Sequence, residues 1–284
     1  MRFPSILFLL LFSGCAAAVA NPPDVQPPDV MDIVRKSCQR DNENLELRRQ
    51  YTWRQIDNIR RLKGSDWKTE RLRAFDIFFI DGTEYRRLAE KDGKALSEKE
   101  AGEEQAKMDR ELGKRKRESE SDRRKRREKD AQELAEERKM RAELPAAFDW
   151  KLLGAEQVNG RPCWKVQAEP KPGYRPVAKN AKFLPKLHGT LWIDQQNYEW
   201  ARVDAESLDT ISAGLGMFRL GKGFRLLLEQ SFINSEIWAP VSVRVKANAR
   251  ALFIGGNFDI DISFKDYRKY SVSSTVSGVE ESNQ

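Results

Sequence analysis

The fold is decided by one stretch of sequence, Leu187-His188-Gly189-Thr190-Leu191-Trp192-Ile193-Asp194, with Gln195-Gln196-Asn197 and Tyr198-Glu199-Trp200-Ala201-Arg202-Val203 after it. This stretch predicts two strands joined by a tight polar turn. Side chains alternate between the two faces of a strand, so Leu187, Leu191 and Ile193 share one face of the first run. The positions between them, Trp192 and Asp194 included, share the other face, and only the first face is predicted to be apolar.

The same alternation recurs over residues 51–89 and 148–272, with turn signals such as Asp81-Gly82 and Asn159-Gly160 between the runs. One helix is predicted before the strands, over residues 29–47, because apolar residues recur at helical spacing at Val30, Ile33, Val34 and Cys38. The chain is therefore predicted to be mainly β, in the α+β class. We expect a curved antiparallel sheet with one apolar face and a packed N-terminal helix.

Charged residues dominate the segment 97–143, in which 31 of 47 residues are charged, 16 basic and 15 acidic. Ser97-Glu98-Lys99-Glu100 is a capping box and most of the segment consists of strong helix formers, so a long helix or a pair of helices is predicted. Gly102 and Gly113 are the predicted weak points, and Pro145 is predicted to close the segment. The charges balance and no aromatic residue is interleaved, which argues against nucleic acid and favours a solvated charged arm.

Residues 1–20 predict an export signal, because Arg2 precedes an apolar run that is too short to span a bilayer. Two processing sites remain open. Cleavage after Ala20 gives a mature chain that begins at Asn21, whereas the lipobox-like residues 12–15 make Cys15 the lipidated first residue. Both alternatives predict an exported protein of a diderm bacterium, either periplasmic or an outer-membrane lipoprotein. A proline-rich spacer is predicted at 21–28, and a loose tail at 273–284.

Cysteine and histidine usage limits the chemistry that the chain can perform. Beyond Cys15 there remain Cys38 and Cys163, for which an oxidising compartment allows a disulfide, with two buried free thiols as the alternative. The only histidine is His188, and no Cys-x-x-Cys pair is present, so we predict neither a metal site nor a cofactor. A histidine on a strand and serines without a nucleophile elbow give no catalytic residue, so a non-enzyme is predicted.

Five motifs in chain order carry a resemblance to a known family: Asp81-Gly82 with Tyr85, Asp92-Gly93-Lys94 with Leu96-Ser97, Gly160-Arg161-Pro162-Cys163-Trp164, Gly189-Thr190-Leu191-Trp192-Ile193-Asp194, and Trp238-Ala239-Pro240 with Val243. The chain resembles the LolA/LolB-like superfamily of periplasmic lipoprotein carriers and receptors. More closely, it is similar to outer-membrane lipoprotein-sorting-type proteins of unknown role. The resemblance implies an incomplete barrel around a cavity for acyl chains. It also implies a single half-barrel domain, 29–96 and 145–272, with 97–144 as a charged helical insertion.

An apolar sheet face has to be covered by helices, by another sheet or by a ligand, and helix material is scarce here. We therefore predict that this face holds acyl chains, at about 0.8 kcal/mol per buried methylene. The alternative is that the same side chains fill a closed core. The candidate cavity wall consists of Trp150, Leu152, Trp164, Val166, Leu191, Ile193, Phe224, Leu226, Leu228, Val243, Val245, Phe258, Ile260 and Ile262.

Two functions follow from these expectations. The first is a lipid- or lipoprotein-binding protein that holds acyl chains, with the role in outer-membrane lipoprotein sorting that the resemblance implies. The second is an envelope structural or interaction module whose charged arm binds a protein or an anionic membrane surface. The second predicts that deleting residues 97–143 leaves folding intact and abolishes partner capture.

Overall fold

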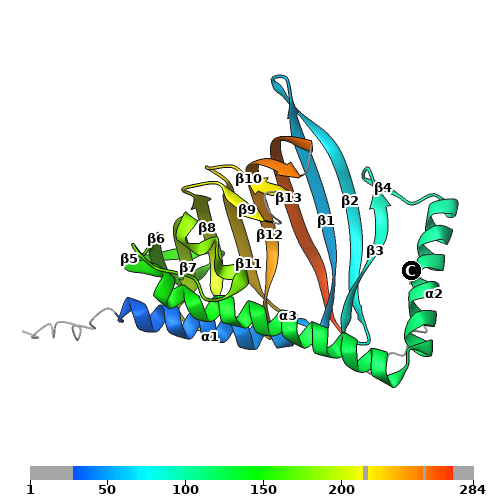
Figure 1. Cartoon of the computed structure of the whole chain (residues 1–284), viewed down its shortest axis with the longest axis horizontal. Helices are drawn as coiled ribbons and strands as arrows, with labels where there is room; N and C mark the ends of the chain where they lie inside the picture. The colour runs from blue at the N-terminus through cyan, green and yellow to red at the C-terminus, as the bar shows by residue number, and fades with distance from the viewer. Residues whose placement is uncertain (1–27, 214–216, 252–253, 271–284) are drawn as a thin grey trace, which may run out of the picture.

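The computed structural model describes residues 28–213, 217–251 and 254–270, which form an antiparallel sheet with α-helices along one side (Figure 1). The main strand order is β4-β3-β2-β1-β13-β12-β11-β8-β7-β6-β5, and the short β10 joins β12 to β9. The edges β4 and β5 do not pair with each other in this part of the chain, so the sheet stays open. This confirms the predicted mainly antiparallel, incomplete barrel. The predicted export signal, Cys15 and the tail at 273–284 lie outside the described residues.

The strands have the following bounds: β1 Tyr51–Lys63, β2 Asp66–Ile80, β3 Thr83–Lys91, β4 Lys94–Ala95, β5 Phe148–Val158, β6 Arg161–Pro170, β7 Leu187–Asp194, β8 Trp200–Ser207, β9 Ile211–Ala213, β10 Phe218–Leu220, β11 Arg225–Ile233, β12 Ile237–Ala251 and β13 Ile254–Lys269. Two short 3-10 helices, Lys179–Ala181 and Leu184–Lys186, lie in the connection between β6 and β7. The predicted turns at Asp81-Gly82 and Asn159-Gly160 are both present, and each of these four residues has a positive φ.

Helix α1 (Val30–Arg48) forms where the sequence predicts it, with the Asp29 side chain accepting a hydrogen bond from the Met31 amide at 3.2 Å. Its apolar stripe packs on the sheet, because Ile33 and Val34 lie in one hydrophobic cluster with Val166 and Ile193. Near the other end of the helix, the buried Asn44 side chain bonds the backbone N–H and C=O of Trp238 at 2.9 and 2.6 Å. The helix is therefore fixed to the sheet by apolar packing at one end and by backbone pairing at the other.

The charged segment forms α2 (Glu98–Arg117) and α3 (Glu120–Ala147), and the predicted capping box at Ser97 and Glu100 is present. The break between the helices falls at Glu118, because the Ser119 side chain caps α3 by accepting from the Asp122 amide at 3.1 Å. The prediction that Gly102 and Gly113 are the weak points is wrong, since both lie inside α2.

Pro145 does not close the charged segment as predicted; it lies within the last turn of α3. The helix continues past it because Leu144 and Ala147 pack in hydrophobic clusters that stabilise this turn. The Pro145 carbonyl accepts a hydrogen bond from the Trp150 indole at 3.3 Å, which satisfies one of the terminal carbonyl groups.

The expectation of a solvated arm is wrong for α3, which crosses the base of the sheet beside α1 (Figure 1). Arg141 of α3 forms an ion pair with the buried Asp41 of α1, with 2.6 Å between Nε and Oδ2. Met140 and Leu144 also pack against a core cluster. Deleting residues 97–143 removes these contacts, so we expect the deletion to destabilise the fold.

Of the two alternatives that the sequence leaves open, the structure contains the two buried free thiols, and Cys38 and Cys163 form no disulfide. The two cysteines lie in separate hydrophobic clusters, one with Val166 and the other with Trp192. Burial, and second to it the charge of Asp41, raises the pKa of Cys38 to about 12, so this thiol stays protonated.

The second face of the hairpin at 187–203 is buried at Trp192 and Asp194, although only the first face was expected to be apolar. Trp192 packs in a cluster with Val158, Cys163, Ala201 and Trp238. Asp194 has no exposed surface and receives two hydrogen bonds from Arg161, at 2.6 and 3.0 Å. This end of the sheet is therefore packed on both faces.

Candidate binding surface

Cross-strand register identifies the side chains that share the face of the sheet on which α1 lies. Direct cross-strand partners point to the same side, and one row of partners runs through Val166, Leu191, Val203, Leu228, Val243, Ile262, Asp57 and Arg73. Because Val166 packs against Ile33 and Val34 of α1, this row lies on the face that the helix covers. We call this the inner face.

A second row on the inner face runs parallel to the first, through Ala168, Gly189, Ala205, Leu226, Val245, Ile260, Ile59 and Arg71. The row needs a glycine at 189, because an added Cβ would lie 2.4 Å from the Asp204 carbonyl oxygen. Both rows are apolar over β8, β11, β12 and β13. On β2 both rows carry an arginine, and the first row continues to Lys91 of β3.

Six of the fourteen predicted wall residues belong to the packed core. Val166 and Ile193 are fully buried under α1, and the others pack against the same cluster. They fill space between the sheet and the helix, so they leave no room for a ligand. The six are Trp150, Leu152, Trp164, Val166, Leu191 and Ile193.

The remaining eight predicted residues lie outside the packed core. Each is half-buried, and none belongs to a hydrophobic cluster of the described residues. Figure 1 shows that β11, β12 and β13 extend well beyond the two helices that cross their base. We call these eight residues the inner-face patch: Phe224, Leu226, Leu228, Val243, Val245, Phe258, Ile260 and Ile262.

A cavity of about 420 Å³ lies at the base of the inner face, where α3 passes over the sheet. We call it the base cavity. Its volume lies within the range of small-molecule pockets in proteins. It meets the inner-face patch, because Phe264 lines it and follows Ile262 on the same side of β13. Its wall consists of Leu45, Arg48, Arg49, Trp53, Phe79, Gly82, Thr83, Glu84, Asp130, Glu133, Leu134, Glu137, Pro240, Phe264 and Tyr267.

The base cavity combines an aromatic floor with a charged rim. Trp53 stacks on Tyr267 with 6.0 Å between ring centroids and tilts against Phe79 at 6.1 Å. The Tyr267 hydroxyl donates to the Pro240 carbonyl at 2.6 Å, and burial raises the pKa of this phenol above its usual value. The floor is thus fixed in place and neutral, as an apolar ligand requires.

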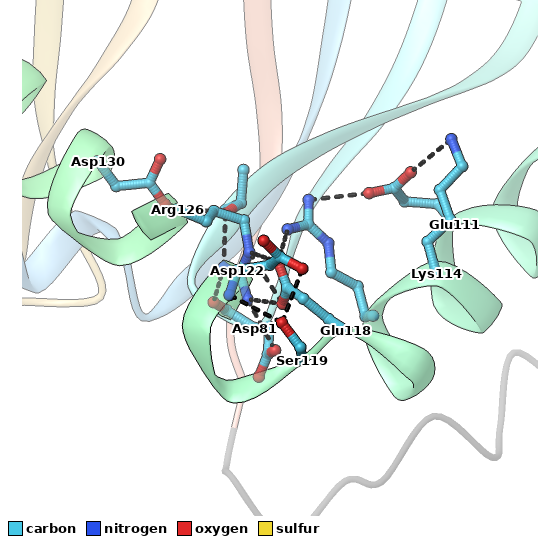
Figure 2. Close-up of polar contacts among 10 residues, drawn as sticks. Asp81, Glu111, Lys114, Glu118, Ser119, Asp122, Arg126 and Asp130 are labelled. Carbon is cyan, nitrogen blue, oxygen red and sulfur yellow. Dashed lines mark hydrogen bonds and ion pairs between the residues drawn. The ribbon is translucent and has the colours of Figure 1, made fainter. Parts of the chain in front are cut away.

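A group of polar contacts holds α3 on the β2–β3 turn beside this cavity (Figure 2). We call this group, formed by Asp81, Thr83, Glu118, Arg126 and Asp130, the elbow. Arg126 donates to Glu118 at 2.8 Å, and to the carboxylate and carbonyl oxygens of Asp81 at 3.0 and 3.1 Å. Thr83 donates to Asp130 at 2.9 Å. The hydrogen bond from Arg126 also lowers the pKa of Glu118, which keeps this carboxyl charged. The elbow fixes the start of α3 and thereby one wall of the base cavity.

The sequence alone did not indicate the base cavity or the elbow. The alternation of Phe75, Ile77 and Phe79 predicts an apolar strand face, but nothing in the pattern says that α3 covers its end. Arg126 sits in a run of five basic residues, and no local signal separates it from its solvated neighbours. The sequence identifies Asp81 only as a turn residue. The contacts between these elements arise from tertiary packing.

The described residues offer no arrangement for metal binding, because no group of three or more His, Cys, Asp or Glu side chains is placed to hold an ion. His188 lies on β7 with its Nδ1 3.7 Å from a Glu169 carboxylate oxygen. None of the helices in this part of the chain is long and apolar enough to cross a membrane.

Comparison with known proteins gives structural likenesses only. No family model matches the sequence, and no curated protein matches it. A DUF1329 family protein from Desulfovibrio piger is similar in structure, with 13% identity, a TM-score of 0.32, and coverage of 87% of this chain and 95% of the other.

Two further structures resemble the chain. A putative outer membrane lipoprotein-sorting protein domain from Vibrio parahaemolyticus has 10% identity, a TM-score of 0.32, and coverage of 83% of this chain and 92% of the other. A LolA superfamily protein from Nitrosomonas europaea has 10% identity, a TM-score of 0.27, and coverage of 86% and 94%. The similar structures are thus of the kinds that the sequence motifs predicted. Likenesses at these TM-scores carry no information on ligand or activity, so the assignment of function rests on the chain's own residues.

Proposed function

We propose that the chain is an exported protein that binds the acyl chains of a lipid or a lipoprotein on the inner-face patch, with the base cavity taking the end of a chain. One observation carries the proposal. Eight half-buried apolar side chains lie together on and beside three adjacent strands, outside every hydrophobic cluster of the described residues. A patch of this kind on a protein surface is typical of a binding site.

The length of the apolar face and the free energy of burying methylene groups agree with a hydrocarbon ligand. From Phe258 to Phe264 the inner face of β13 runs for roughly 20 Å, at about 3.3 Å per residue. Burying one methylene contributes about 0.8 kcal/mol, so ten methylenes contribute about 8 kcal/mol. Association costs about 4 to 15 kcal/mol in lost freedom. A single short chain therefore binds weakly, and a long or paired acyl ligand is the better match.

The proposal is one of binding without catalysis, because the patch presents only hydrocarbon side chains to its ligand. A charged arm that captures a partner has less support. Arg126, Arg141 and Glu143 of α3 use their charges in contacts within the chain, to Asp81, Asp41 and the Ala178 amide respectively.

Export and a role in outer-membrane lipoprotein sorting are part of the proposal. They rest on the sequence of residues 1–20 and on the motifs of the carrier superfamily. The mass of the mature N-terminal peptide tests the location. A diacylglyceryl group on Cys15 would place the protein on a membrane, and a free Asn21 would make it periplasmic.

The test of acyl binding compares two substitutions on neighbouring residues of β11. Leu228 lies on the inner face opposite Val243, whereas Leu227 lies on the outer face opposite Arg244. We would measure binding of a pyrene-labelled phosphatidylcholine by fluorescence, and co-purified acyl species by native mass spectrometry. Leu228→Glu places a carboxylate in the patch and should weaken binding at least tenfold, which is 1.4 kcal/mol.

Leu227→Glu is the matched control, because it makes the same chemical change beside Arg244 on the opposite face. It should bind lipid as the wild type does. Equal losses in the two variants, with both folded by circular dichroism, would remove the inner-face patch as the binding site. Absence of both co-purified acyl species and lipid uptake in the wild type would overturn the proposed function.

A further inference from the structure

We propose that Arg71 and Arg73 of β2 form a binding site for the anionic head group of a phospholipid whose acyl chains lie on the inner-face patch. The inference rests on the proposed function, since the patch supplies the site for the chains. It adds a preference among lipids, which an apolar surface alone does not provide.

Register places the two arginines at the end of the two apolar rows. Ile262 pairs with Asp57, which pairs with Arg73; Ile260 pairs with Ile59, which pairs with Arg71. Neighbouring strands lie about 4.8 Å apart, so the Cα of Arg71 is about 10 Å from that of Ile260. A head group bound by the arginines is thus directly beside chains that cover β11, β12 and β13.

At residues 71–73 of β2 the inner face carries charged side chains and the outer face an apolar one, the reverse of the pattern on β12 and β13. Arg71 and Arg73 occupy inner-face positions. Leu72 between them faces the other side, where its Cδ2 atom would lie 3.5 Å from a Cβ added at Gly93. Further along β2 the same inner face carries apolar side chains, Phe75 and Ile77. Two cations therefore stand where the pattern of the strand calls for apolar residues, at the border of an apolar surface.

Neither Arg71 nor Arg73 forms an ion pair or a side-chain hydrogen bond with any described residue. The nearby carboxylates are already engaged. Asp57, which lies opposite Arg73, accepts hydrogen bonds from Arg86 at 3.0 Å and from Gln55 at 2.7 Å. The two charges on this part of the inner face are therefore left for a ligand.

Glu70, the residue that precedes Arg71, is also engaged, because it lies 3.5 Å from Arg61 and 3.4 Å from Lys63. The outer face of the same strands shows the opposite arrangement. There Asp76 pairs with Arg54 at 2.8 Å and with Arg87 at 2.9 Å. Arg71 and Arg73 thus differ from the paired arginines on both faces of these strands, such as Arg86, which is paired with Asp57 on the inner face.

A phosphodiester fits this pair by charge and by geometry. Residues two apart on a strand lie roughly 7 Å from each other on one face, and both guanidinium groups can donate to oxygens of one phosphate. Guanidinium binds phosphate oxygens with two parallel hydrogen bonds and loses less hydration energy than an ammonium group does. The adjoining apolar surface favours a phospholipid over free phosphate, because free phosphate has no acyl chain to bury on that surface.

The test measures how the full mature chain takes up labelled lipid from vesicles of phosphatidylglycerol and, separately, of phosphatidylcholine with the same acyl chains. The wild type should take up phosphatidylglycerol about tenfold better, the effect of one charge-assisted hydrogen bond. R71Q/R73Q should abolish this preference and leave uptake of phosphatidylcholine unchanged.

R244Q/K246Q is the matched control, because it also removes two positive charges, from the outer face of β12. It should keep the preference. Equal uptake of the two lipids by the wild type would overturn the head-group site and leave acyl binding intact. If both double variants lost the preference for phosphatidylglycerol equally, the preference would arise from net charge only, and this result would also overturn the site. Failure to take up either lipid would overturn the proposed function itself.

Discussion

Glu199, which immediately precedes β8, is a buried carboxyl group that forms no ion pair with any described residue. It is 5% exposed, and its Oε2 has no hydrogen-bond partner. Burial, and second to it the charge of Asp41, raises the pKa of Glu199 to about 8 from an ordinary 4.5. The group binds its proton more tightly in the folded chain than in the unfolded chain. Its contribution to stability is therefore complete below pH 4.5 and is lost as the pH rises through 8.

We expect the free energy of unfolding of the wild type to fall between pH 5 and pH 8, by up to about 1.4 kcal/mol per pH unit from this group. Glu199→Gln should remove that part of the slope, as measured by urea denaturation at several pH values. Glu206→Gln, a change at an exposed position of the neighbouring β8, should keep the wild-type slope. Identical slopes in the wild type and Glu199→Gln would contradict the assignment.

The Arg161–Asp194 pair is the second residue-scale prediction. Asp194 has no exposed surface and accepts from Arg161 at 2.6 and 3.0 Å, so removing the arginine leaves a buried charge unpaired. We expect Arg161→Met to lower the free energy of unfolding at pH 7 by about 3 kcal/mol.

The control is Arg225→Met, which breaks a pair of similar length on the surface. Arg225 lies 2.7 Å from Asp204, but its side chain is 60% exposed. Loss of such a pair costs about 0 to 1 kcal/mol. Equal effects of the two substitutions would show that burial of Asp194 does not set the strength of its pair.

At the scale of elements, α3 is the part of the chain whose position the sequence does not reveal. Its amino-acid composition predicts a helix, and the helix is present. Its placement depends on a few contacts that do not repeat along the sequence, such as Arg141 with Asp41. Strand alternation, by contrast, depends on residues next to one another, so the faces of β11 and β13 could be predicted.

The Arg126 elbow makes a prediction about α3. Arg126 is 13% exposed and bonds Glu118, Asp81 and Thr83. We expect Arg126→Ala to speed amide hydrogen exchange in the first two turns of α3 by roughly tenfold or more, because it removes several hydrogen bonds to charged groups. Mass spectrometry of peptides from residues 118–130 would measure the exchange.

Arg124→Ala serves as the control, since Arg124 is 68% exposed and its nearest carboxylate, that of Glu128, is 3.8 Å away. Its exchange should match the wild type. If Arg126→Ala exchanged no faster than Arg124→Ala, then the contacts to the β2–β3 turn would not hold α3 in place.

At the scale of the whole molecule, two helices cross the open sheet only at its base (Figure 1). The residues of the inner-face patch are half-buried and lie outside the hydrophobic clusters of the described residues. The sequence predicted which side chains share the apolar face, because pleat and register follow from alternation. It could not tell core from uncovered surface. Leu191 and Leu228 follow the same pattern, yet the first packs against the α1 cluster and the second lies outside every cluster of the described residues. That difference arises from the path of α1 across the sheet.

The central claim is that acyl chains lie on the inner-face patch, and photo-crosslinking tests it most directly. The full mature chain would be loaded with a phosphatidylcholine that carries a diazirine in its acyl chain, irradiated, digested and analysed by mass spectrometry. We expect adducts on peptides from residues 224–233, 242–247 and 258–264, and their loss in Leu228→Glu but not in Leu227→Glu. Adducts confined to the outer face, or spread evenly over the sheet and helices, would contradict the claim.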